Sequence, residues 1–254
     1  HDVPWLARDE LAALIQSVGI DILVDLSGHT GGHRLTVFAL KPAPIQASWI
    51  GYFHSTGMGS IDYFITDPCT SPPDCGQLFS EIPVRLPHSR FCFTPREQSP
   101  DVSSPPFEQS GFTTFGSFNR LGKLNDEVLG AWASILSRVP DARLMLKDKS
   151  LGDAGVVGQL QTRFAERGIA PERIVIRAQT DYLAMLGEYG EVDIALDPFP
   201  FNGGMTTMDA LWMGVPVIAL AGNTVVSRQS LSLLSNIGHT ELSFPDVESY
   251  IDGA

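Results

Sequence analysis

The sequence is poor in cysteine, and its few cysteines are not spaced as metal ligands or as a disulfide framework. Cys69, Cys75 and Cys92 are the three present, and none belongs to a CxxC pair. This pattern is typical of reduced thiols in a cytosol, so we expect a cytoplasmic protein without structural zinc or disulfides. No basic segment followed by an apolar one is present, so no signal peptide is indicated.

Long apolar runs and an excess of basic residues are also missing. No run reaches the roughly 18 apolar residues that a membrane-spanning helix requires. Lys and Arg number 17 against 29 Asp and Glu, which makes the net charge −12. We therefore expect neither a membrane nor a nucleic acid as partner, because sequence-independent binding to either needs positive charge.

Several motifs of nucleotide enzymes are absent as well. Gly57 and Gly59 lack the third glycine of a dinucleotide-binding GxGxxG and open no helix, which disfavours a dehydrogenase. A P-loop is missing, and so is an obvious pair of catalytic carboxylates. Because no DxD run follows a predicted strand, we expect no metal-bound diphosphate.

The 254 residues, of which 43% are hydrophobic, can bury one large core or two of ordinary size. Apolar runs that alternate with helical patterns and glycine-rich loops predict a doubly wound α/β fold. His1 is not preceded by Met, and both ends fall close to predicted helices, so we expect part of a longer polypeptide. In residues 1–94 the predicted helices are 9–18 and 35–40, and the predicted strands are 20–26, 45–52, 61–66 and 83–86.

Residues 95–110 are rich in proline and serine, and we expect them to link two α/β halves that enclose a cleft. Residues 111–254 then restart the alternation, with residues 116–123 as the loop that leaves the first strand. The strands of this half are predicted over 112–115, 143–147, 174–176, 192–196 and 215–220, and the helices over 126–137, 154–167, 182–189, 206–214 and 225–237.

The βαβ unit over residues 192–220 organises the second half. A buried strand leads into a loop with Asn202, Gly203 and Gly204, and a helix begins near Thr206. A helix N-terminus in this position binds anions, because its first N–H groups have no partner within the helix. We therefore predict that a nucleotide diphosphate binds here.

Cationic residues follow the other predicted strands of this half. The carboxyl ends of parallel strands meet at one edge of a sheet, so as a set these residues favour a phosphate pocket. Any one of them could equally be a solvated residue at a polar strand exit. The set consists of Arg120, Lys123, Lys147, Lys149 and Arg177.

Two groups of polar residues leave alternatives open. Thr206 and Asp209 have the spacing of a capping box, yet the carboxylate could instead hold a ribose diol. In the first half, His29, His33 and His54 lie in loops that follow strands. Each could act as a general base or bind a sugar, and each could also be an ordinary loop histidine.

Some blocks of the chain are more specific than these patterns. They are 25–30 (DLSGHT), 41–52 (KPAPIQASWIGY), 61–67 (IDYFITD), 115–123 (FGSFNRLGK) and 197–216. Together they resemble glycosyltransferase family 41, which comprises O-linked N-acetylglucosamine transferases and the SPINDLY-type O-fucosyltransferases. The resemblance extends over nearly the whole chain, in the right order.

The resemblance implies a GT-B fold, with two Rossmann-like halves of which the C-terminal one holds most of the nucleotide sugar. It implies that Lys123 contacts the donor diphosphate and stabilises the leaving group, and that Asp209 holds the ribose. The other donor-binding positions are Arg120, Gln179, Thr180, Asp181, Gly203, Gly204, Met205, Thr206 and Thr207. On the side of the donor sugar and the acceptor we expect His29, Thr30, Gly51 and His54.

The chain also departs from the family pattern. Gly204 and Met205 stand where the family has His-Thr or Thr-Thr, and Arg120 stands where a neutral amide is usual. The family segment that carries the general base has no counterpart before His1, so we expect an incomplete N-terminal half and a base upstream. The resemblance further implies N-terminal tetratricopeptide repeats in the full-length protein and additional C-terminal helices.

These expectations combine into an inverting, metal-independent protein O-glycosyltransferase without a cofactor. Its substrates would be a nucleotide sugar, with UDP-GlcNAc favoured, and a Ser or Thr of a protein or peptide acceptor. One alternative is the SPINDLY-type donor, GDP-fucose, which blocks 85–87 and 114–119 favour. Another is a module that binds a nucleotide sugar without turning it over.

Overall fold

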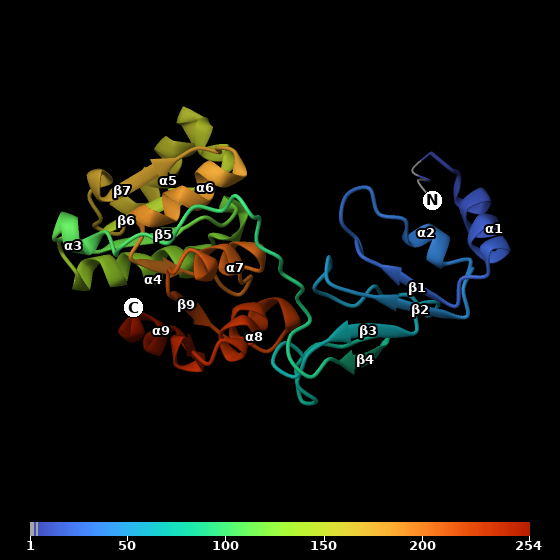
Figure 1. The fold of residues 1–254 in the computed structure, drawn as a ribbon. Helices are drawn as coiled ribbons and strands as arrows, with labels where there is room; N and C mark the ends of the chain where they lie inside the picture. The colour runs from blue at the N-terminus through green and yellow to red at the C-terminus, as the bar shows by residue number, and fades with distance from the viewer. Residues whose placement is uncertain (1–2, 4) are drawn as a thin grey trace. The chain divides into compact units, whose positions relative to one another are not determined.

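The computed structural model describes residue 3 and residues 5–254, which form two α/β units (Figure 1). Unit 1 holds the chain up to Cys92 together with Asn223–Val226, and unit 2 holds Phe93–Gly222 and Ser227–Ala254. In the part of the chain that the structure describes, no helix combines the length and apolar character of a membrane span.

The Pro/Ser-rich segment 95–110, expected to be a linker, is grouped with unit 2 and packs against it. The Arg96 guanidinium lies 4.6 Å from the centre of the Tyr182 ring. The segment includes the short helix α3 (Phe107–Ser110), whose Phe107 N–H donates to Asp193 Oδ1 at 2.8 Å. These contacts hold the segment along its length, so it is part of the fold of unit 2.

Unit 1 is built on a four-stranded parallel sheet with the order β1-β2-β3-β4. Leu35, Phe38 and Ile61 form its buried cluster, against which Leu23 and Met58 pack. The elements follow the predicted order, although β1, β2 and β3 are shorter than their predicted runs and β4 begins one residue earlier than predicted. They are α1 (Arg8–Val18), β1 (Ile22–Asp25), α2 (Leu35–Phe38), β2 (Ile45–Ser48), β3 (Tyr63–Thr66) and β4 (Ile82–Arg85).

Unit 2 contains a six-stranded parallel sheet with the order β7-β6-β5-β8-β9-β10. Counted within the unit this is 3-2-1-4-5-6, the order of a doubly wound dinucleotide-binding fold. Its strands are β5 (Thr114–Ser117), β6 (Arg143–Lys147), β7 (Ile174–Arg177), β8 (Ile194–Leu196), β9 (Val217–Leu220) and β10 (Ser243–Phe244). The expectation of a doubly wound parallel sheet is confirmed for this unit.

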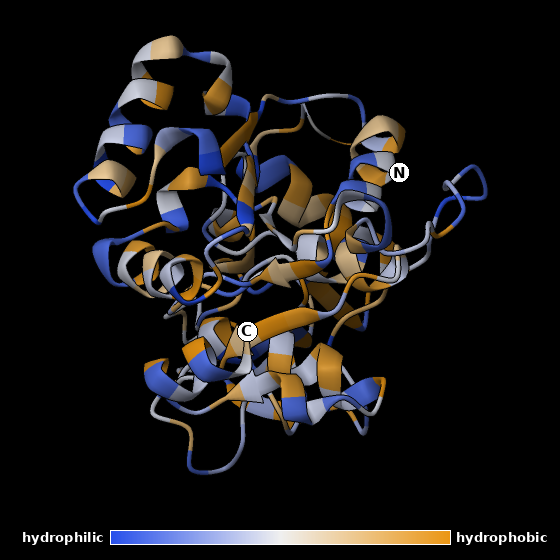
Figure 2. Ribbon diagram, turned by 90° about the vertical axis from the view of Figure 1, so that its left-hand side faces the viewer, coloured by the Kyte–Doolittle hydropathy of each residue, from blue (hydrophilic) through white to orange (hydrophobic). Residues whose placement is uncertain are grey.

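Helices cover both faces of this sheet. One apolar cluster joins the sheet to α4, α5 and α9, and a second joins it to α6 and α7. The strands are largely orange in Figure 2, whereas the helices alternate between blue and orange, as expected for buried strands beneath amphipathic helices. The helices are α4 (Asp126–Arg138), α5 (Ala154–Ala165), α6 (Tyr182–Glu188), α7 (Met205–Trp212), α8 (Gln229–Asn236) and α9 (Val247–Gly253).

Two predicted boundaries in unit 2 are wrong for identifiable reasons. The strand predicted over 112–115 is β5, which continues through Gly116 to Ser117 before its exit loop begins. Gly116 fits inside the strand because a Cβ there would come within 2.6 Å of a Val192 methyl group. The helix predicted from Val225 begins only at Gln229, because a 3₁₀ turn over Val225–Arg228 precedes it.

Candidate functional site

Unit 2 has a topological switch point between β5 and β8, which are neighbours in the sheet. The loop after β5 leads to α4 on one face, and the loop after β8 leads to α7 on the other. Ligands of open α/β sheets bind at such a point, outside the carboxyl ends of the strands. We call residues 118–123 and 197–204, together with the first turn of α7, the switch-point site.

Lys123 is the central cation of the switch-point site. Its ammonium group donates to Asn119 Oδ1 at 2.8 Å and to the Asn202 carbonyl at 2.9 Å, and it lies 4.4 Å from the centre of the Phe201 ring. Burial lowers the pKa of Lys123 to about 8; nearby Asp197 raises it and Arg120 lowers it. Both hydrogen-bond acceptors are neutral, so an incoming anion would meet an ammonium group without a carboxylate bound to it.

The loop after β8 is fixed by Asp197, which is only 2% exposed. Its Oδ1 accepts the Gly203 N–H at 2.7 Å, and its Oδ2 accepts the Ser230 hydroxyl at 2.7 Å. Burial raises the pKa of Asp197 to about 6, against the lowering effects of Ser230, Lys123 and Gly203. The Asp197 carbonyl also accepts the Tyr250 hydroxyl at 3.2 Å, so the end of β8 is anchored from α9 as well.

Gly203 brings this loop close to the first turn of α7. A Cβ at Gly203 would lie 2.4 Å from Thr207 Oγ1 and 2.7 Å from Thr206 Oγ1, so a larger residue does not fit. Gly204 is the residue before α7, and Met205, the first residue of the helix, is 57% exposed. The first N–H groups of α7 therefore lie at an accessible helix end, where a helix attracts anions.

The capping-box interpretation of Thr206 and Asp209 is wrong. The helix begins at Met205, Gly204 is its N-cap, and no side chain caps it. The Thr206 hydroxyl instead donates to Asn119 Oδ1 at 3.1 Å, so it joins the loop after β5 to α7. Asn119 thus accepts from both Thr206 and Lys123 and holds the two sides of the switch-point site together.

Asp209 and Thr207 are both 2% exposed. The Tyr182 hydroxyl donates to Asp209 Oδ1 at 2.7 Å, and Thr207 Oγ1 lies 3.0 Å from Ser230 Oγ. Burial raises the pKa of Asp209, and burial and the Asp209 carboxylate raise the pKa of Tyr182 to about 12, so Tyr182 is the donor. Asp209 Oδ2 makes no hydrogen bond to a residue that the structure describes, whereas the Thr207 hydroxyl is engaged inside the unit.

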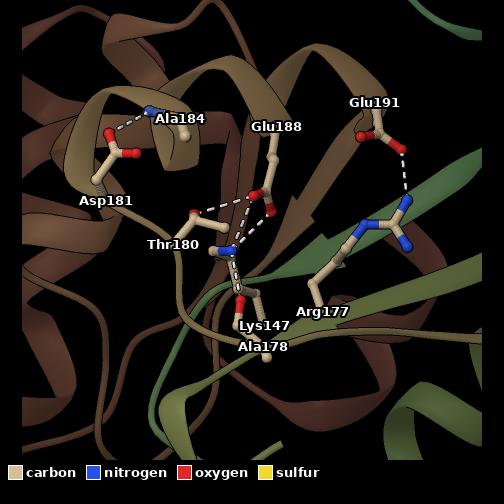
Figure 3. Close-up of polar contacts among 8 residues, drawn as sticks. All are labelled: Lys147, Arg177, Ala178, Thr180, Asp181, Ala184, Glu188 and Glu191. Carbon is tan, nitrogen blue, oxygen red and sulfur yellow. Dashed lines mark hydrogen bonds and ion pairs between the residues drawn. The ribbon is translucent and has the colours of Figure 1, made fainter. Parts of the chain in front are cut away.

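The cations that follow the strands do not form one pocket. Lys147 is 6% exposed and pairs with Glu188, its Nζ lying 2.8 Å from Oε2, and Arg177 pairs with Glu191 at 2.9 Å (Figure 3). Only Arg120 and Lys123, which share the exit loop of β5, belong to the switch-point site; Arg120 is exposed there. The prediction of a single cationic set is therefore wrong, because Lys147 and Arg177 form ion pairs with acidic residues of α6 and of the turn after it.

Residues 178–181 follow β7 and are exposed. Ala178 accepts from Lys147 through its carbonyl, Thr180 donates to Glu188, and Asp181 caps α6 by accepting the Ala184 N–H at 3.0 Å (Figure 3). The side chain of Gln179 makes no hydrogen bond to any residue that the structure describes. The next residue, Tyr182, binds Asp209, so this segment adjoins α7 in unit 2.

The remaining candidates lie in unit 1, in loops that follow β1 and β2. His29 Nε2 lies 2.8 Å from the Thr56 carbonyl, the Thr30 hydroxyl donates to the Ser27 carbonyl at 2.7 Å, and His54 is exposed. Gly51 packs against the backbone, because a Cβ there would lie 1.8 Å from the Leu26 carbonyl oxygen. His29, Thr30, Gly51 and His54 are all exposed at the carboxyl end of this sheet.

A family model described as Glycosyl transferase family 41 matches residues 6–100 and 110–254 of this chain. The chain belongs to glycosyltransferase family 41. Among family relatives, the probable UDP-N-acetylglucosamine–peptide N-acetylglucosaminyltransferase SPINDLY of Oryza sativa subsp. japonica is 38% identical over 255 residues. That alignment covers 99% of this chain and 27% of the relative. The protein SEC of Arabidopsis thaliana, which carries the same enzyme description, is 35% identical and is covered to 25%.

A solved structure agrees with this family assignment. A mutant of the O-GlcNAc transferase of Thermobaculum terrenum is 40% identical, with a TM-score of 0.95, over 100% of this chain and 48% of that one. The sucrose-phosphate synthase of Thermosynechococcus elongatus, at 11% identity and a TM-score of 0.52, shares the fold alone. The predicted GT-B fold is confirmed, and the chain spans about half of the solved transferase.

Some residues that hold the switch-point site together were not assigned a role from the sequence. They are Asn119, Asp197, Asn202 and Ser230, which hold the site through hydrogen bonds between distant segments. Asp197 had the clearest signal, because it is an acidic residue directly after a buried strand. Ser230 had none, because a serine within a predicted helix is more often at the surface.

Proposed function

We propose that this chain is the donor-binding part of a protein O-glycosyltransferase that transfers GlcNAc from UDP-GlcNAc to Ser or Thr of a protein or peptide. The single observation that carries the proposal is the position of Lys123 beside the accessible N-terminus of α7, with only neutral hydrogen-bond acceptors. This arrangement suits a diphosphate, which would replace neutral acceptors by charged oxygens. The family relatives named above supply the sugar and the acceptor class.

The mechanism that follows is an inverting displacement. An acceptor hydroxyl would attack the anomeric carbon in line with the departing diphosphate, and its proton would pass to a general base. Negative charge that develops on the leaving diphosphate would be stabilised by Lys123 and by the first N–H groups of α7. No step in this mechanism needs a metal, because these groups already supply positive potential where the charge develops.

The nucleoside would lie on the side of Asp209 and residues 178–181. Asp209 retains Oδ2 for a ribose hydroxyl, and Tyr182 joins Asp209 to the segment after β7. Gln179, Thr180 and Asp181 would therefore flank the base, while Gly203, Gly204, Met205 and Thr206 would surround the diphosphate. Thr207 would act through its backbone N–H, because its hydroxyl is engaged with Ser230. In unit 1, His29, Thr30, Gly51 and His54 would serve the donor sugar or the acceptor.

Calorimetry with UDP and GDP tests the proposal. We expect UDP to bind, with a dissociation constant at least about tenfold lower than that of GDP, a difference of about 1.4 kcal/mol. Tighter binding of GDP would instead favour the GDP-fucose donor. If neither nucleotide binds, the switch-point site is not a donor site and the proposal is wrong. If a nucleotide does bind, transfer of labelled GlcNAc to a protein acceptor distinguishes an enzyme from a binding module.

A further inference from the structure

A buried ion pair lies beneath the exposed segment that follows β7. Lys147, the last residue of β6, pairs with Glu188, the last residue of α6, and their side chains are 6% and 16% exposed. The Lys147 ammonium group lies 2.9 Å from Glu188 Oε1 and 2.8 Å from Oε2. The pair therefore lies inside unit 2, away from most of the solvent.

Each member of the pair also makes a hydrogen bond to the segment after β7 (Figure 3). Lys147 donates to the Ala178 carbonyl at 2.7 Å, and Glu188 accepts the Thr180 hydroxyl at 3.0 Å. Asp181 is fixed separately, because it caps the first turn of α6. Residues 178–181 are thus exposed to solvent and also held in place by hydrogen bonds to the unit, as a preorganised binding surface would be.

Stability alone does not explain why a lysine and a glutamate occupy these positions. Removing two charges from water costs free energy that their mutual attraction often fails to repay, and an apolar pair of similar volume can be as stable. An apolar pair, however, could not hold the Ala178 carbonyl or the Thr180 hydroxyl. What the ion pair adds is a defined backbone conformation for residues 178–181.

This conformation matters because of what adjoins the segment. Tyr182, the next residue, donates to Asp209 of α7, so residues 178–181 and the first turns of α7 belong to one connected surface of unit 2. Gln179 is exposed in the middle of the segment, and its amide can donate and accept hydrogen bonds, as can the backbone beside it. A nucleobase edge presents the complementary set of donors and acceptors.

We propose that Lys147 and Glu188 are positioning residues, which preorganise residues 178–181 to bind the nucleobase of the donor. This inference rests on the proposed nucleotide-sugar site. Preorganisation lowers the conformational entropy that is lost on binding, so it strengthens binding of a ligand that contacts the segment. It leaves unchanged the binding of a ligand that contacts only the diphosphate groups and the ribose-binding carboxylate.

The test replaces both members of the pair, so that no buried charge is left alone. The variant Lys147→Met/Glu188→Met keeps similar side-chain volumes but loses both anchors of the segment. Its matched control is Arg177→Gln/Glu191→Gln, which removes the neighbouring ion pair; that pair is 39% and 51% exposed and holds no residue of the segment. Dissociation constants are measured by calorimetry for ADP and for whichever of UDP and GDP the wild type prefers, and Tm confirms folding.

We expect the Lys147/Glu188 double variant to bind the preferred nucleotide roughly tenfold more weakly, and ADP within twofold of wild type, so that discrimination between bases falls. The control should match wild type for both nucleotides. Unchanged affinity for the preferred nucleotide, or an equal loss for both, would overturn the positioning role while leaving the proposed function intact. If wild type itself binds none of the three nucleotides, the proposed function fails first, and the inference fails with it.

Discussion

Lys147 ends β6 and Lys123 lies in the loop after the neighbouring strand β5; both are at least partly buried, yet their partners differ in charge. Lys147 lies against the carboxylate of Glu188, whereas the hydrogen bonds of Lys123 go to a side-chain amide and a backbone carbonyl. A lysine with a carboxylate partner gains little from a second anion. A lysine with neutral partners gains a great deal, because a phosphate supplies the missing negative charge.

One sheet edge thus carries a lysine whose hydrogen-bond acceptors are neutral and another whose charge is compensated by a carboxylate. Lys123 keeps an unfavourable environment in the free protein, as the lowering of its pKa to about 8 indicates. Binding of an anion would relieve that cost. Lys147 has its charge compensated within unit 2, so its contribution is to hold α6 and the segment after β7 in place.

The largest difference between the two lysines is expected in the free energy of unfolding when each is removed singly. Lys147→Met leaves the Glu188 carboxylate buried without its cation, so we expect the free energy of unfolding to fall by about 3 to 5 kcal/mol. Lys123→Met leaves no carboxylate hydrogen-bonded to an absent partner, and we expect a change within about 1 kcal/mol. Urea denaturation of both variants at neutral pH measures the difference. Equal losses would show that the two lysines have the same structural role.

Lys123 should matter much more for nucleotide binding than for stability. We expect Lys123→Ala to weaken UDP binding more than about 100-fold, close to 3 kcal/mol, because charge-assisted hydrogen bonds to the diphosphate are lost. Calorimetry with UDP measures this, and an unchanged melting temperature would show that the variant is folded. The exposed residue Lys149 supplies a control, since Lys149→Ala should bind UDP as wild type does. Unchanged affinity in Lys123→Ala would remove this residue from the diphosphate site.

A smaller effect should follow from pH. The pKa of Lys123 is lowered to about 8 in the free protein, and a bound diphosphate would raise it again. Between pH 7 and pH 8 the lysine is mostly charged in both states, so affinity should change little. Above pH 8 the free protein loses the proton that the complex needs, so affinity should fall, by up to about tenfold for each further pH unit.

The control for the pH effect is Lys123→Arg. A guanidinium group stays charged across this range, so the variant should show no decline between pH 8 and pH 10. Calorimetry at several pH values, in buffers of equal ionic strength, measures both proteins. A decline of the same size in wild type and in Lys123→Arg would show that another group is responsible.

Much of unit 2 could be predicted from local patterns. Short apolar runs, glycine stops and helical spacing predicted the order of β5 to β9 and of the helices between them, and the loop with Gly203 and Gly204 predicted that a helix begins there. Strand ends were predicted less accurately. The sequence predicts that Gly116 belongs to a loop, whereas in the structure it lies in β5 and packs against the Val192 side chain. Pattern in a single segment does not reveal what packs on it.

The same limit applied to the polar residues. The spacing of Thr206 and Asp209 fits a capping box, and only the fold shows that each side chain has a partner elsewhere, in Asn119 and Tyr182. Residues 95–110 have the composition of a linker, yet contacts with Tyr182 and Asp193 hold them on unit 2.

The α/β alternation, the helix that begins after β8, the family and the choice of Lys123 as a diphosphate-binding candidate all follow from the sequence. The tertiary structure adds which lysine has neutral partners and which has a carboxylate. Lys147 ends β6 and Lys123 lies in the loop after β5, and neither local sequence shows whether a carboxylate meets the lysine. Their partners are remote: the Asn202 carbonyl lies 79 residues from Lys123 along the chain, and Glu188 lies 41 residues from Lys147. Folding brings a neutral acceptor to one lysine and a carboxylate to the other.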